Sequence, residues 1–515
     1  MSTSNEARFR DLTQFNLDPA SIRRLPQEFC RRNQIVVLGR VDPEGDEPVT
    51  LGMVQPDDAR LLDEVRRRLG RDIEPVRLNG FEVERALALY SGAGGGIGEL
   101  LIPFDGQDPG PEASPREVID HLLQEAVRRK ASDIHIETYF NDVDVRLRID
   151  GMLHQHFTHL SPESAGEVIS RLKITSNLDI AERRKAQDGR FRAVFTDGNA
   201  RKPVDFRVSV VPSPAGEDAV IRVLDASQGL LPLSVLGMPR RIEETFTQLL
   251  NNPEGMVLVT GPTGSGKTTT LYAALNHLRT DTRKIITAED PIEYYIDKIN
   301  QKEETPVMSM AQLIRALMRQ DPNVLLFGEI RDRDMGELAL EASATGHVVL
   351  STLHTADAVG AVVRLRSLDL EDVDIATALL GVIGQRLVRQ ICPQCATPTE
   401  ANARQTALFG VLLEGRSLFK GVGCDACRGT GVRGRVGLFE LLVVDEALQD
   451  MIAGGNSRTL LKRYAREHLG FRTMLEDGLD KLDAGGTTLD ELERVLPFRQ
   501  IVTERLERGE KAGQG

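Results

Sequence analysis

A glycine-rich segment between an apolar run and a helical pattern is the feature that most constrains the fold of this chain. It reads Gly261-Pro-Thr-Gly-Ser-Gly-Lys-Thr268 and fits the pattern G-x-x-x-x-G-K-[ST] in full. The apolar run Met256-Val-Leu-Val-Thr260 precedes it, and a helical pattern from Thr269 to Leu278 follows it. Glycines let successive backbone N–H groups turn toward one point, where the helix adds its positive dipole end. The order of strand, loop and helix predicts a phosphate-binding loop in an α/β protein.

This loop predicts a bound nucleoside triphosphate. In such loops the lysine, here Lys267, reaches the β- and γ-phosphates, and the hydroxyl of the next residue, Thr268, holds Mg²⁺. A chance glycine-rich turn before a helix is the alternative, and the complete strand, loop and helix disfavour it. The residues expected to bind the nucleotide are Gly261, Pro262, Thr263, Gly264, Ser265, Gly266, Lys267, Thr268 and Thr269.

Shifts in composition along the 515 residues predict several domains, because a chain of this length exceeds one core. Residues 1–104 mix short apolar runs with amphipathic helical patterns, and residues 105–114 are rich in Pro, Gly and acids, as linkers are. Residues 115–230 predict a compact α+β domain. In residues 236–515 strands alternate with helices, which is typical of a parallel sheet covered on both faces, and the part beyond residue 441 is helical.

Charge and hydropathy exclude some classes of function. The net charge of −13 argues against general nucleic-acid binding. The N-terminus has no apolar leader, and no run approaches 18 apolar residues, so we expect any membrane contact to be peripheral. The basic stretch from Arg171 to Arg192 lacks interleaved aromatic residues, which favours a solvated or inter-subunit face over a nucleic-acid site. Gly94-Gly-Gly96 lacks a following Lys-Ser/Thr, so a flexible connection is favoured over a second phosphate loop.

Carboxylates and histidines flank the predicted strands near the phosphate loop. Glu293 lies in Glu289-Asp-Pro-Ile-Glu293 after one strand, and Glu329 follows the strand 324–327. His347 precedes another strand and His354 follows it. Hydrolysis of a γ-phosphate needs a positioned water, a carboxylate, a metal and cations, and these residue types supply them. Taken one at a time, each is equally well explained as a polar loop residue; taken together they favour catalysis.

Two C-x-x-C pairs predict a structural zinc site. They are Cys392-Pro-Gln-Cys395 and Cys424-Asp-Ala-Cys427, with 28 residues between them. Four thiolates close a tetrahedral Zn²⁺ site and leave no open position for chemistry, so the insertion at about residues 390–437 is expected to bind zinc. Four free buried cysteines are the alternative. Cys30, in a helical and charged segment, is expected to be a lone thiol.

With these motifs, the chain resembles a known family, the ATPases that power bacterial type II secretion and type IV pili within the type II/IV secretion NTPase superfamily. The similarity covers about residues 115–500. It rests on the phosphate loop, on Glu289 to Glu293 (that family's Asp box), on Leu317-Met-Arg-Gln-Asp-Pro322 with Gly328-Glu-Ile-Arg-Asp332 (Walker B), on Gly346-His-Val-Val-Leu-Ser-Thr-Leu-His354 (His box), and on Ala131 to Glu137 and Ala181 to Phe191. One departure is Ala356, which stands where the family usually has Asn after the second histidine.

The resemblance implies a fold and roles for residues. The fold is a RecA-like core with a parallel sheet, preceded by a PAS-like α+β domain and an N-terminal α/β docking domain. ATP is the implied nucleotide; Glu293 would activate the water, and Glu329 with Thr268 would hold Mg²⁺. The family's arginines would sense the γ-phosphate and stabilise charge as the domains close. They fall on Arg207 and Arg222 before the core and on Arg315, Arg319 and Arg331 within it.

The resemblance also implies partners. The family forms homohexamers at the cytoplasmic face of the inner membrane, docked on a GspL-type protein and a GspF-type polytopic protein. Lys267 to Ala274 and Ala358 to Leu365 are more similar to the type II secretion ATPases (GspE class) than to the pilus-extension enzymes. The zinc insertion is typical of both, whereas retraction ATPases generally lack it.

Three alternatives stay open: a pilus-extension ATPase, a nucleic-acid-stimulated RecA-like motor, and a non-catalytic scaffold, which the complete boxes disfavour. Some family members bind cyclic di-GMP through the N-terminal domain, and residues 1–104 contain no clear nucleotide-binding repeat.

Overall fold

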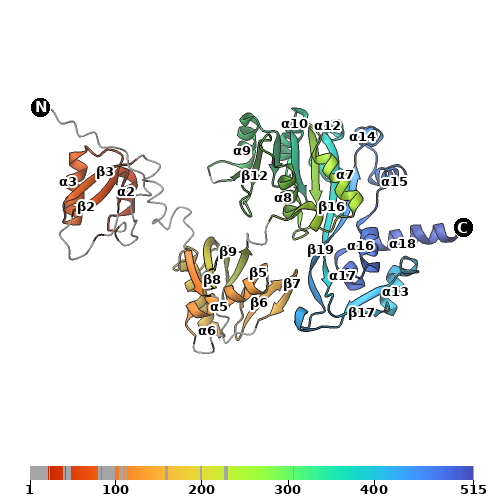
Figure 1. Cartoon of the computed structure of the whole chain (residues 1–515), viewed down its shortest axis with the longest axis horizontal. Coiled ribbons are helices and arrows are strands. Elements are labelled where there is room, and N and C mark those ends of the chain that lie inside the picture. The colour runs from red at the N-terminus through yellow and green to blue at the C-terminus, as the bar shows by residue number, and fades with distance from the viewer. Residues whose placement is uncertain are drawn as a thin grey trace. The chain divides into compact units, whose positions relative to one another are not determined.

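The computed structural model describes residues 21, 24–38, 41, 48–78, 83, 99–103, 110, 113–156, 160–197, 200–225, 230–305 and 307–513 (Figure 1). Two compact units make up the chain, residues 1–149 with 153–225 and residues 150–152 with 226–515. The glycine run 94–96 and most of the predicted linker 105–114 lie outside the described residues. In the part of the chain that is described, no helix combines the length and apolar character needed to cross a membrane.

The N-terminal part has a small sheet with its own core. Its strands are in the order β1-β2-β3, with β1 antiparallel and β3 parallel to β2. The elements are α2 (Gln27–Asn33), β1 (Ile35–Val37), β2 (Val49–Met53), α3 (Ala59–Leu69) and β3 (Ile73–Arg77). Cys30 is buried in this core, and burial raises the pKa of its thiol to about 11. It is a free cysteine, as predicted.

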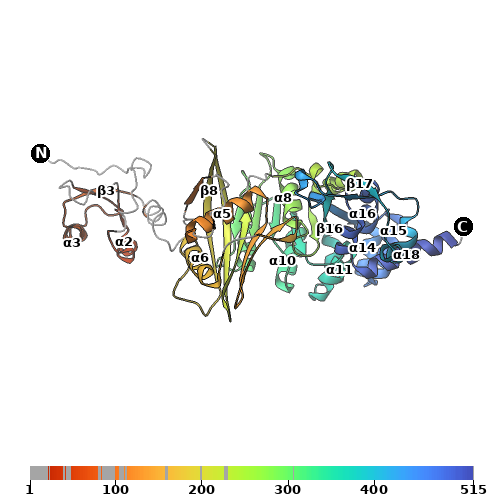
Figure 2. The same ribbon diagram turned by 90° about the horizontal axis from the view of Figure 1, so that it is seen from below.

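A seven-stranded sheet forms the rest of the first unit, in the order β4-β8-β9-β10-β5-β6-β7. Helices α5 and α6 lie side by side against it (Figure 2), and each begins at a serine N-cap with a capping box. Strand β4, inside the segment 1–104 expected to be the N-terminal domain, pairs with β8 of this sheet. The elements are β4 (Glu99–Pro103), α5 (Pro115–Arg128), β5 (Asp133–Thr138), β6 (Val143–Ile149), β7 (Met152–Gln155), α6 (Pro162–Thr175), β8 (Gln187–Asp197), β9 (Ala200–Ser213) and β10 (Gly216–Leu224).

The basic stretch from Arg171 to Arg192 is mostly solvated, with one exception. Arg183 and Arg190 are exposed. Lys173 is completely buried, and its ammonium donates to Glu217 at 2.6 Å and to a main-chain carbonyl at 2.8 Å. A buried ammonium needs this pairing because desolvation otherwise disfavours its charge. The expectation of a solvated face is therefore wrong for Lys173.

The core of the second unit is a sheet in the order β13-β12-β14-β15-β11-β16-β19. The first six strands are parallel, and β19 is antiparallel to β16. Alternate residues of β11 enter different cores: Met256 and Leu258 pack on one face, and Val257 and Val259 on the other. Helices therefore cover both faces, as the sequence predicts (Figure 1).

The elements of this core follow one another as strands alternating with helices. They are η3 (Leu233–Val235), α7 (Arg240–Leu250), β11 (Gly255–Thr260), α8 (Lys267–Leu278), β12 (Ile285–Glu289), β13 (Asn300–Glu303), α9 (Met310–Leu317), η4 (Met318–Gln320), β14 (Val324–Phe327), α10 (Arg333–Ala344), β15 (Val348–Leu353), α11 (Ala358–Ser367), α12 (Asp372–Ala378), β16 (Leu379–Ile391) and β19 (Val432–Val443).

Between β16 and β19 lies the cysteine insertion, and helices follow β19. The insertion contains β17 (Ala396–Thr399), α13 (Ala403–Phe409), η5 (Gly410–Leu413), β18 (Leu418–Gly421) and η6 (Asp425–Cys427). The helices are α14 (Glu446–Ala453), α15 (Arg458–His468), α16 (Met474–Asp483), α17 (Leu489–Val495) and α18 (Phe498–Gly513). Thr488 caps α17 through the N–H of Glu491, while the Glu491 carboxylate binds Arg389 and Arg494.

Candidate active site at the phosphate loop

The phosphate loop joins β11 to α8 at the carboxyl edge of the parallel sheet. Its first glycine is required by close packing, because a Cβ on Gly261 would stand 2.3 Å from the carbonyl oxygen of Gln385. Thr260 ties this edge to β15: its hydroxyl donates to Leu353 O at 3.1 Å and lies 2.7 Å from the Thr355 hydroxyl. These contacts hold the residue between them, His354, beside the loop.

Two side chains of the loop, Lys267 and Ser265, can donate further hydrogen bonds to an anion. The Lys267 ammonium donates to two carbonyls of its own loop, Gly261 O at 2.9 Å and Pro262 O at 3.2 Å, and lies 3.4 Å from His354 Nδ1. The Ser265 hydroxyl is buried and has no hydrogen-bond partner among the described residues. Burial lowers the pKa of Lys267, and Glu329 opposes the shift. A cation and a hydroxyl in a glycine-rich cradle at a helix N-terminus fit a phosphate group.

A line of charged side chains extends from the loop along the ends of the neighbouring strands. His354 Nε2, after β15, lies 3.4 Å from Glu329 Oε1, after β14. Arg331 then lies 3.2 Å from Glu329 and 3.2 Å from Asp290, which follows β12. Four adjacent strands thus contribute to one edge. The sequence predicts Glu329, His354 and Arg331 there, and the structure adds Asp290 as a partner of Arg331.

Glu293 is held by groups that the sequence analysis did not single out. Its main-chain N–H donates to the Tyr272 hydroxyl at 3.3 Å, and Tyr272 donates to the buried Glu289. Gln301 also reaches Glu289, at 3.2 Å. In the sequence, these groups could have been found from an acid at the end of a mostly apolar strand and from a tyrosine on the helix that follows the phosphate loop.

His347 lies away from the phosphate loop of its own chain, and its predicted place in the catalytic set stays a prediction. It precedes β15, and its carbonyl accepts from the N–H of Gly255, the first residue of β11. The loop follows the last residue of β11, so about 20 Å of strand separates the two. The His347 ring lies 2.9 Å from Ala342 O and 3.1 Å from the Thr345 hydroxyl. Within the chain it belongs to the opposite edge of the sheet.

The other predicted arginines are exposed or lie on the first unit. Arg315 and Arg319 are exposed on α9 and η4, where the Arg319 guanidinium donates to Arg315 O at 2.7 Å. Arg207 and Arg222 are cross-strand partners on β9 and β10 of the first unit. Arg222 also donates to Asp133 at 3.1 Å. Their contact with a nucleotide stays a prediction.

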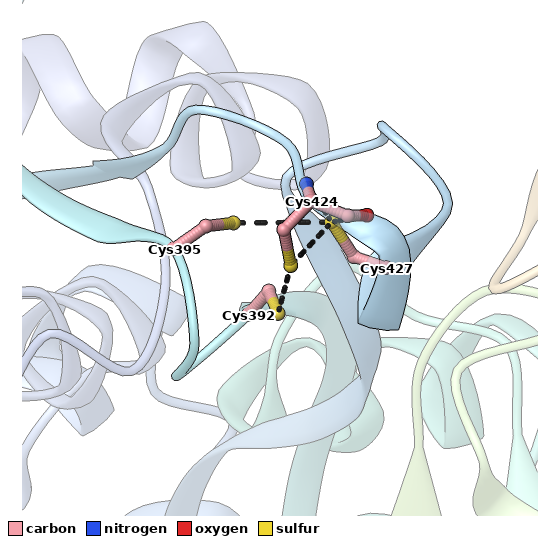
Figure 3. A group of neighbouring side chains, drawn as sticks. All are labelled: Cys392, Cys395, Cys424 and Cys427. Atoms are coloured by element: carbon pink, nitrogen blue, oxygen red, sulfur yellow. Dashed lines mark hydrogen bonds between the residues drawn. The ribbon is translucent and has the colours of Figure 1, made fainter.

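The four predicted cysteine ligands lie together (Figure 3), with all four sulfur atoms within 4.8 Å of one another. The Sγ–Sγ distances are 3.8 Å for Cys392–Cys424, 3.8 Å for Cys395–Cys427 and 3.7 Å for Cys424–Cys427. A tetrahedral zinc ion with bonds of about 2.3 Å places sulfur atoms about 3.8 Å apart. The residues therefore fit Zn²⁺, and these separations exclude disulfides.

The backbone around Cys427 supports thiolate charge on that sulfur, whereas burial raises the pKa of the Cys395 thiol to about 11. Burial raises the pKa of the Cys427 thiol, but the N–H groups of Cys424 and Gly431, at 3.1 and 3.2 Å, outweigh burial and lower it to about 6. Gly421 lets the segments that carry the two cysteine pairs approach each other, because a Cβ there would lie 1.9 Å from Gly431 O.

Comparisons with known proteins agree with this geometry. The model of the family described as type II/IV secretion system protein matches residues 111–494, and the MshEN domain model matches residues 6–97. The chain is 39% identical to the type II secretion system ATPase E of Vibrio cholerae, covering 94% of this chain and 99% of the relative. It is 38% identical to the type IV pilus assembly ATPase PilB of Thermus thermophilus, covering 92% of this chain and 54% of the relative.

Among solved structures, the pilus retraction motor PilT with bound ADP matches with a TM-score of 0.51 and 27% identity, covering 75% of this chain and 98% of that chain. The α/β fold of this chain, with its parallel sheet, therefore matches that of a solved ATPase structure. The chain belongs to the type II/IV secretion system protein family, as an ATPase of the type II secretion (GspE) class that is related to the pilus-assembly ATPase PilB.

Proposed function

We propose that this ATPase hydrolyses ATP at the carboxyl edge of its parallel sheet to drive pseudopilus assembly in type II secretion. The observation that carries the proposal is the line of charge from Lys267 through His354 and Glu329 to Arg331 beside the phosphate loop. In this proposal the core is RecA-like and the α+β part of the first unit is PAS-like, as the family resemblance implies.

The proposed roles follow from the positions of the side chains. Bound Mg²⁺–ATP supplies the γ-phosphate that is transferred to water. Lys267 and the N–H groups of the loop would hold the phosphates, and the oxygens of Thr268 and Glu329 would hold Mg²⁺, since Mg²⁺ prefers oxygen ligands. Glu293 accepts the proton of the attacking water. His354, between Lys267 and Glu329, orients both groups.

We further propose that the arginines complete the site when the two units close on each other. Arg331 balances charge at the edge, and Arg315 and Arg319 supply exposed guanidinium groups. Arg207 and Arg222 come from the first unit, so hydrolysis is coupled to movement between units, a source of mechanical stroke. The working state is a ring-shaped homohexamer, as the family resemblance implies.

Glu293→Gln tests the catalytic assignment. The variant keeps the shape of the side chain but cannot accept the proton, so hydrolysis is expected to fall at least about 100-fold. Binding of a fluorescent ATP analogue should remain within about two-fold of the parent, since the phosphates are held elsewhere. Single-turnover hydrolysis and equilibrium titration measure the two quantities. A parallel loss of binding and rate would make Glu293 a structural or metal-binding residue.

The N-terminal part is proposed to dock the motor on its membrane partners, a GspL-type protein and a GspF-type protein of the inner membrane. Residues 6–97 match a separate domain model, and β1–β3 have their own core. The proposed location is therefore the cytoplasmic face of the inner membrane, reached through these partners. The proposal expects no direct nucleic-acid contact.

Deleting residues 1–97 tests docking and spares β4, which pairs with β8. ATP binding should be retained, while membrane recruitment and secretion are lost in cells. Cell fractionation and a secretion assay check this outcome. Normal secretion by the truncated protein would remove the docking role, and normal secretion with failed pilus extension in a strain lacking the whole gene would favour the pilus assignment.

The tetracysteine cluster is proposed to hold one structural Zn²⁺ through Cys392, Cys395, Cys424 and Cys427. The support is the fit of the sulfur separations to a tetrahedral ion. Four protein ligands leave no open position, so the metal stabilises the insertion and takes no part in hydrolysis.

A further inference from the structure

A buried polar network lies behind the segment that carries Glu293. At its centre is the carboxylate of Glu289, the last residue of β12, which is buried. Three side chains donate to it: the Thr287 hydroxyl at 2.6 Å, Gln301 Nε2 at 3.2 Å and the Tyr272 hydroxyl. Tyr272 and Thr287 are also buried, so the bonds that these two side chains make do not compete with bulk water.

The network reaches Glu293 through one atom. A tyrosine hydroxyl has one proton, and Tyr272 donates it to Glu289, which leaves the oxygen to accept. The N–H of Glu293 donates to that oxygen at 3.3 Å. Burial, together with the neighbouring Glu289 carboxylate, raises the pKa of Tyr272, so the hydroxyl keeps its proton and its direction at neutral pH.

The rest of the segment between β12 and β13 is fixed by the same groups. Gln301 donates to Tyr294 O at 3.1 Å and accepts from the N–H of Ile296 at 2.7 Å. The rings of Tyr272 and Tyr294 pack edge to face, with centroids 4.7 Å apart. Several contacts therefore fix the position of the main chain around Glu293 relative to α8.

Tyr272 lies on α8, the helix that begins with Lys267. One rigid helix thus carries the cation of the phosphate loop and the hydroxyl that holds the main chain of Glu293. From this arrangement we infer that Tyr272 and Glu289 are positioning residues, which set the distance between Glu293 and the phosphate loop. The inference rests on the proposed role of Glu293 as the base. Displacing a catalytic base by about 1 Å lowers the rate of hydrolysis about 100-fold, so residues that fix its position affect turnover.

Tyr272→Phe tests the inference in the full-length protein. The ring and its packing on Tyr294 stay, while the hydroxyl that joins Glu289 to Glu293 is lost. We expect kcat to fall about 10- to 100-fold while the Kd for a fluorescent ATP analogue changes less than about two-fold. The control is Tyr295→Phe, which removes a hydroxyl from the same segment; this side chain is 78% exposed and has no hydrogen bond with the described residues. Its kcat should match the parent.

A second variant guards against a loss of folding. Glu289→Gln keeps the side-chain shape but replaces one accepting oxygen with an amide nitrogen that cannot accept. Either the Tyr272 or the Thr287 hydroxyl therefore loses its acceptor. It should show the same split, with reduced kcat and retained ATP-analogue binding. If Tyr272→Phe unfolds the protein, the kcat-against-Kd split of Glu289→Gln decides the question alone.

A double variant separates positioning from other effects. If Tyr272 acts through Glu293, Tyr272→Phe should not slow the residual single-turnover rate of Glu293→Gln further, because the two act as one unit. Multiplicative losses would overturn the inference, as would equal losses of kcat, affinity and thermal stability in Tyr272→Phe. Full hydrolysis by Glu293→Gln would instead remove the base assignment, whatever Tyr272→Phe does.

Discussion

The carboxylates at the phosphate-loop edge differ from those beneath the C-terminal helices in what they leave for a ligand. Glu329 is 27% exposed, and its partners are side chains, His354 and Arg331. Glu440 and Glu491 are 1% exposed and accept from main-chain N–H groups. A partly exposed acid bound by side chains can still offer oxygens to a metal or water, whereas a buried acid that accepts from the backbone is more typical of a structural role.

The two buried acids also differ from each other. Burial raises the pKa of Glu491, but the guanidinium groups of Arg494 and Arg389 outweigh burial and hold it at about 2. Glu440 accepts from Ala358 N at 2.6 Å and from Met474 N at 3.0 Å, and its pKa rises to about 7 because burial dominates. It thereby joins the starts of α11 and α16, and no cation among the described residues forms an ion pair with it. The comparison predicts that changes at the loop edge affect turnover, and changes beneath the C-terminal helices affect stability.

The largest expected effect is that of Lys267→Ala on turnover. It removes the cation of the phosphate loop, and the rate of phosphate release should fall about 1000-fold or more. The unfolding temperature should change little, because the Lys267 ammonium bonds to its own loop and to the neighbouring His354 at the edge of the sheet. Lys298→Ala, an exposed lysine paired with Asp281, is the control and should hydrolyse normally. An unchanged rate in Lys267→Ala would contradict the site assignment.

A change in the cysteine cluster should show the opposite pattern. One zinc per chain is expected by elemental analysis, and Cys427→Ser should abolish it and destabilise the insertion by several kcal/mol, since structural zinc contributes folding energy directly. Binding of an ATP analogue should persist. Cys30→Ser is the control and should keep its zinc. Metal-free parent protein of full stability would disprove the zinc site.

The sequence predicts what is local in this fold. The phosphate loop, its strand and its helix are contiguous, so their order alone determines the geometry. The positions of the two histidines depend on the direction of one strand, and a catalytic role for His347 stays a prediction. In a parallel sheet the direction of β15 puts His347 and His354 at opposite edges.

Contacts between segments far apart in the chain could not be predicted from the sequence. The pattern Thr488 to Glu491 predicts a reciprocal capping box, but Arg389 lies 102 residues earlier and takes the Glu491 carboxylate. Tyr272 and Glu293 are likewise joined only when β12 lies beside α8. The pairing of β4 with β8 depends on a strand that ends before the predicted linker begins. In each case a neighbour brought by the tertiary fold decides the role of the side chain.

The smallest predicted effect is a change in stability with pH at Glu440. Its pKa in the folded protein is about 7, above the usual 4.5, because burial and Asp357 disfavour the carboxylate. A raised acid pKa stabilises the fold fully below pH 4.5, and this stabilisation is lost as pH rises to about 7, up to about 3 kcal/mol. Glu440→Gln cannot ionise, so its stability should not fall with pH in this way. At every pH, one of the two N–H groups that donate to Glu440 in the parent loses its acceptor in the variant. We therefore expect the unfolding free energy of the parent minus that of Glu440→Gln to decrease between pH 5 and pH 8. Urea unfolding across this range measures the difference, and a constant difference would mean that Glu440 stays ionised in the fold, held by Lys462 and the two helix N-termini.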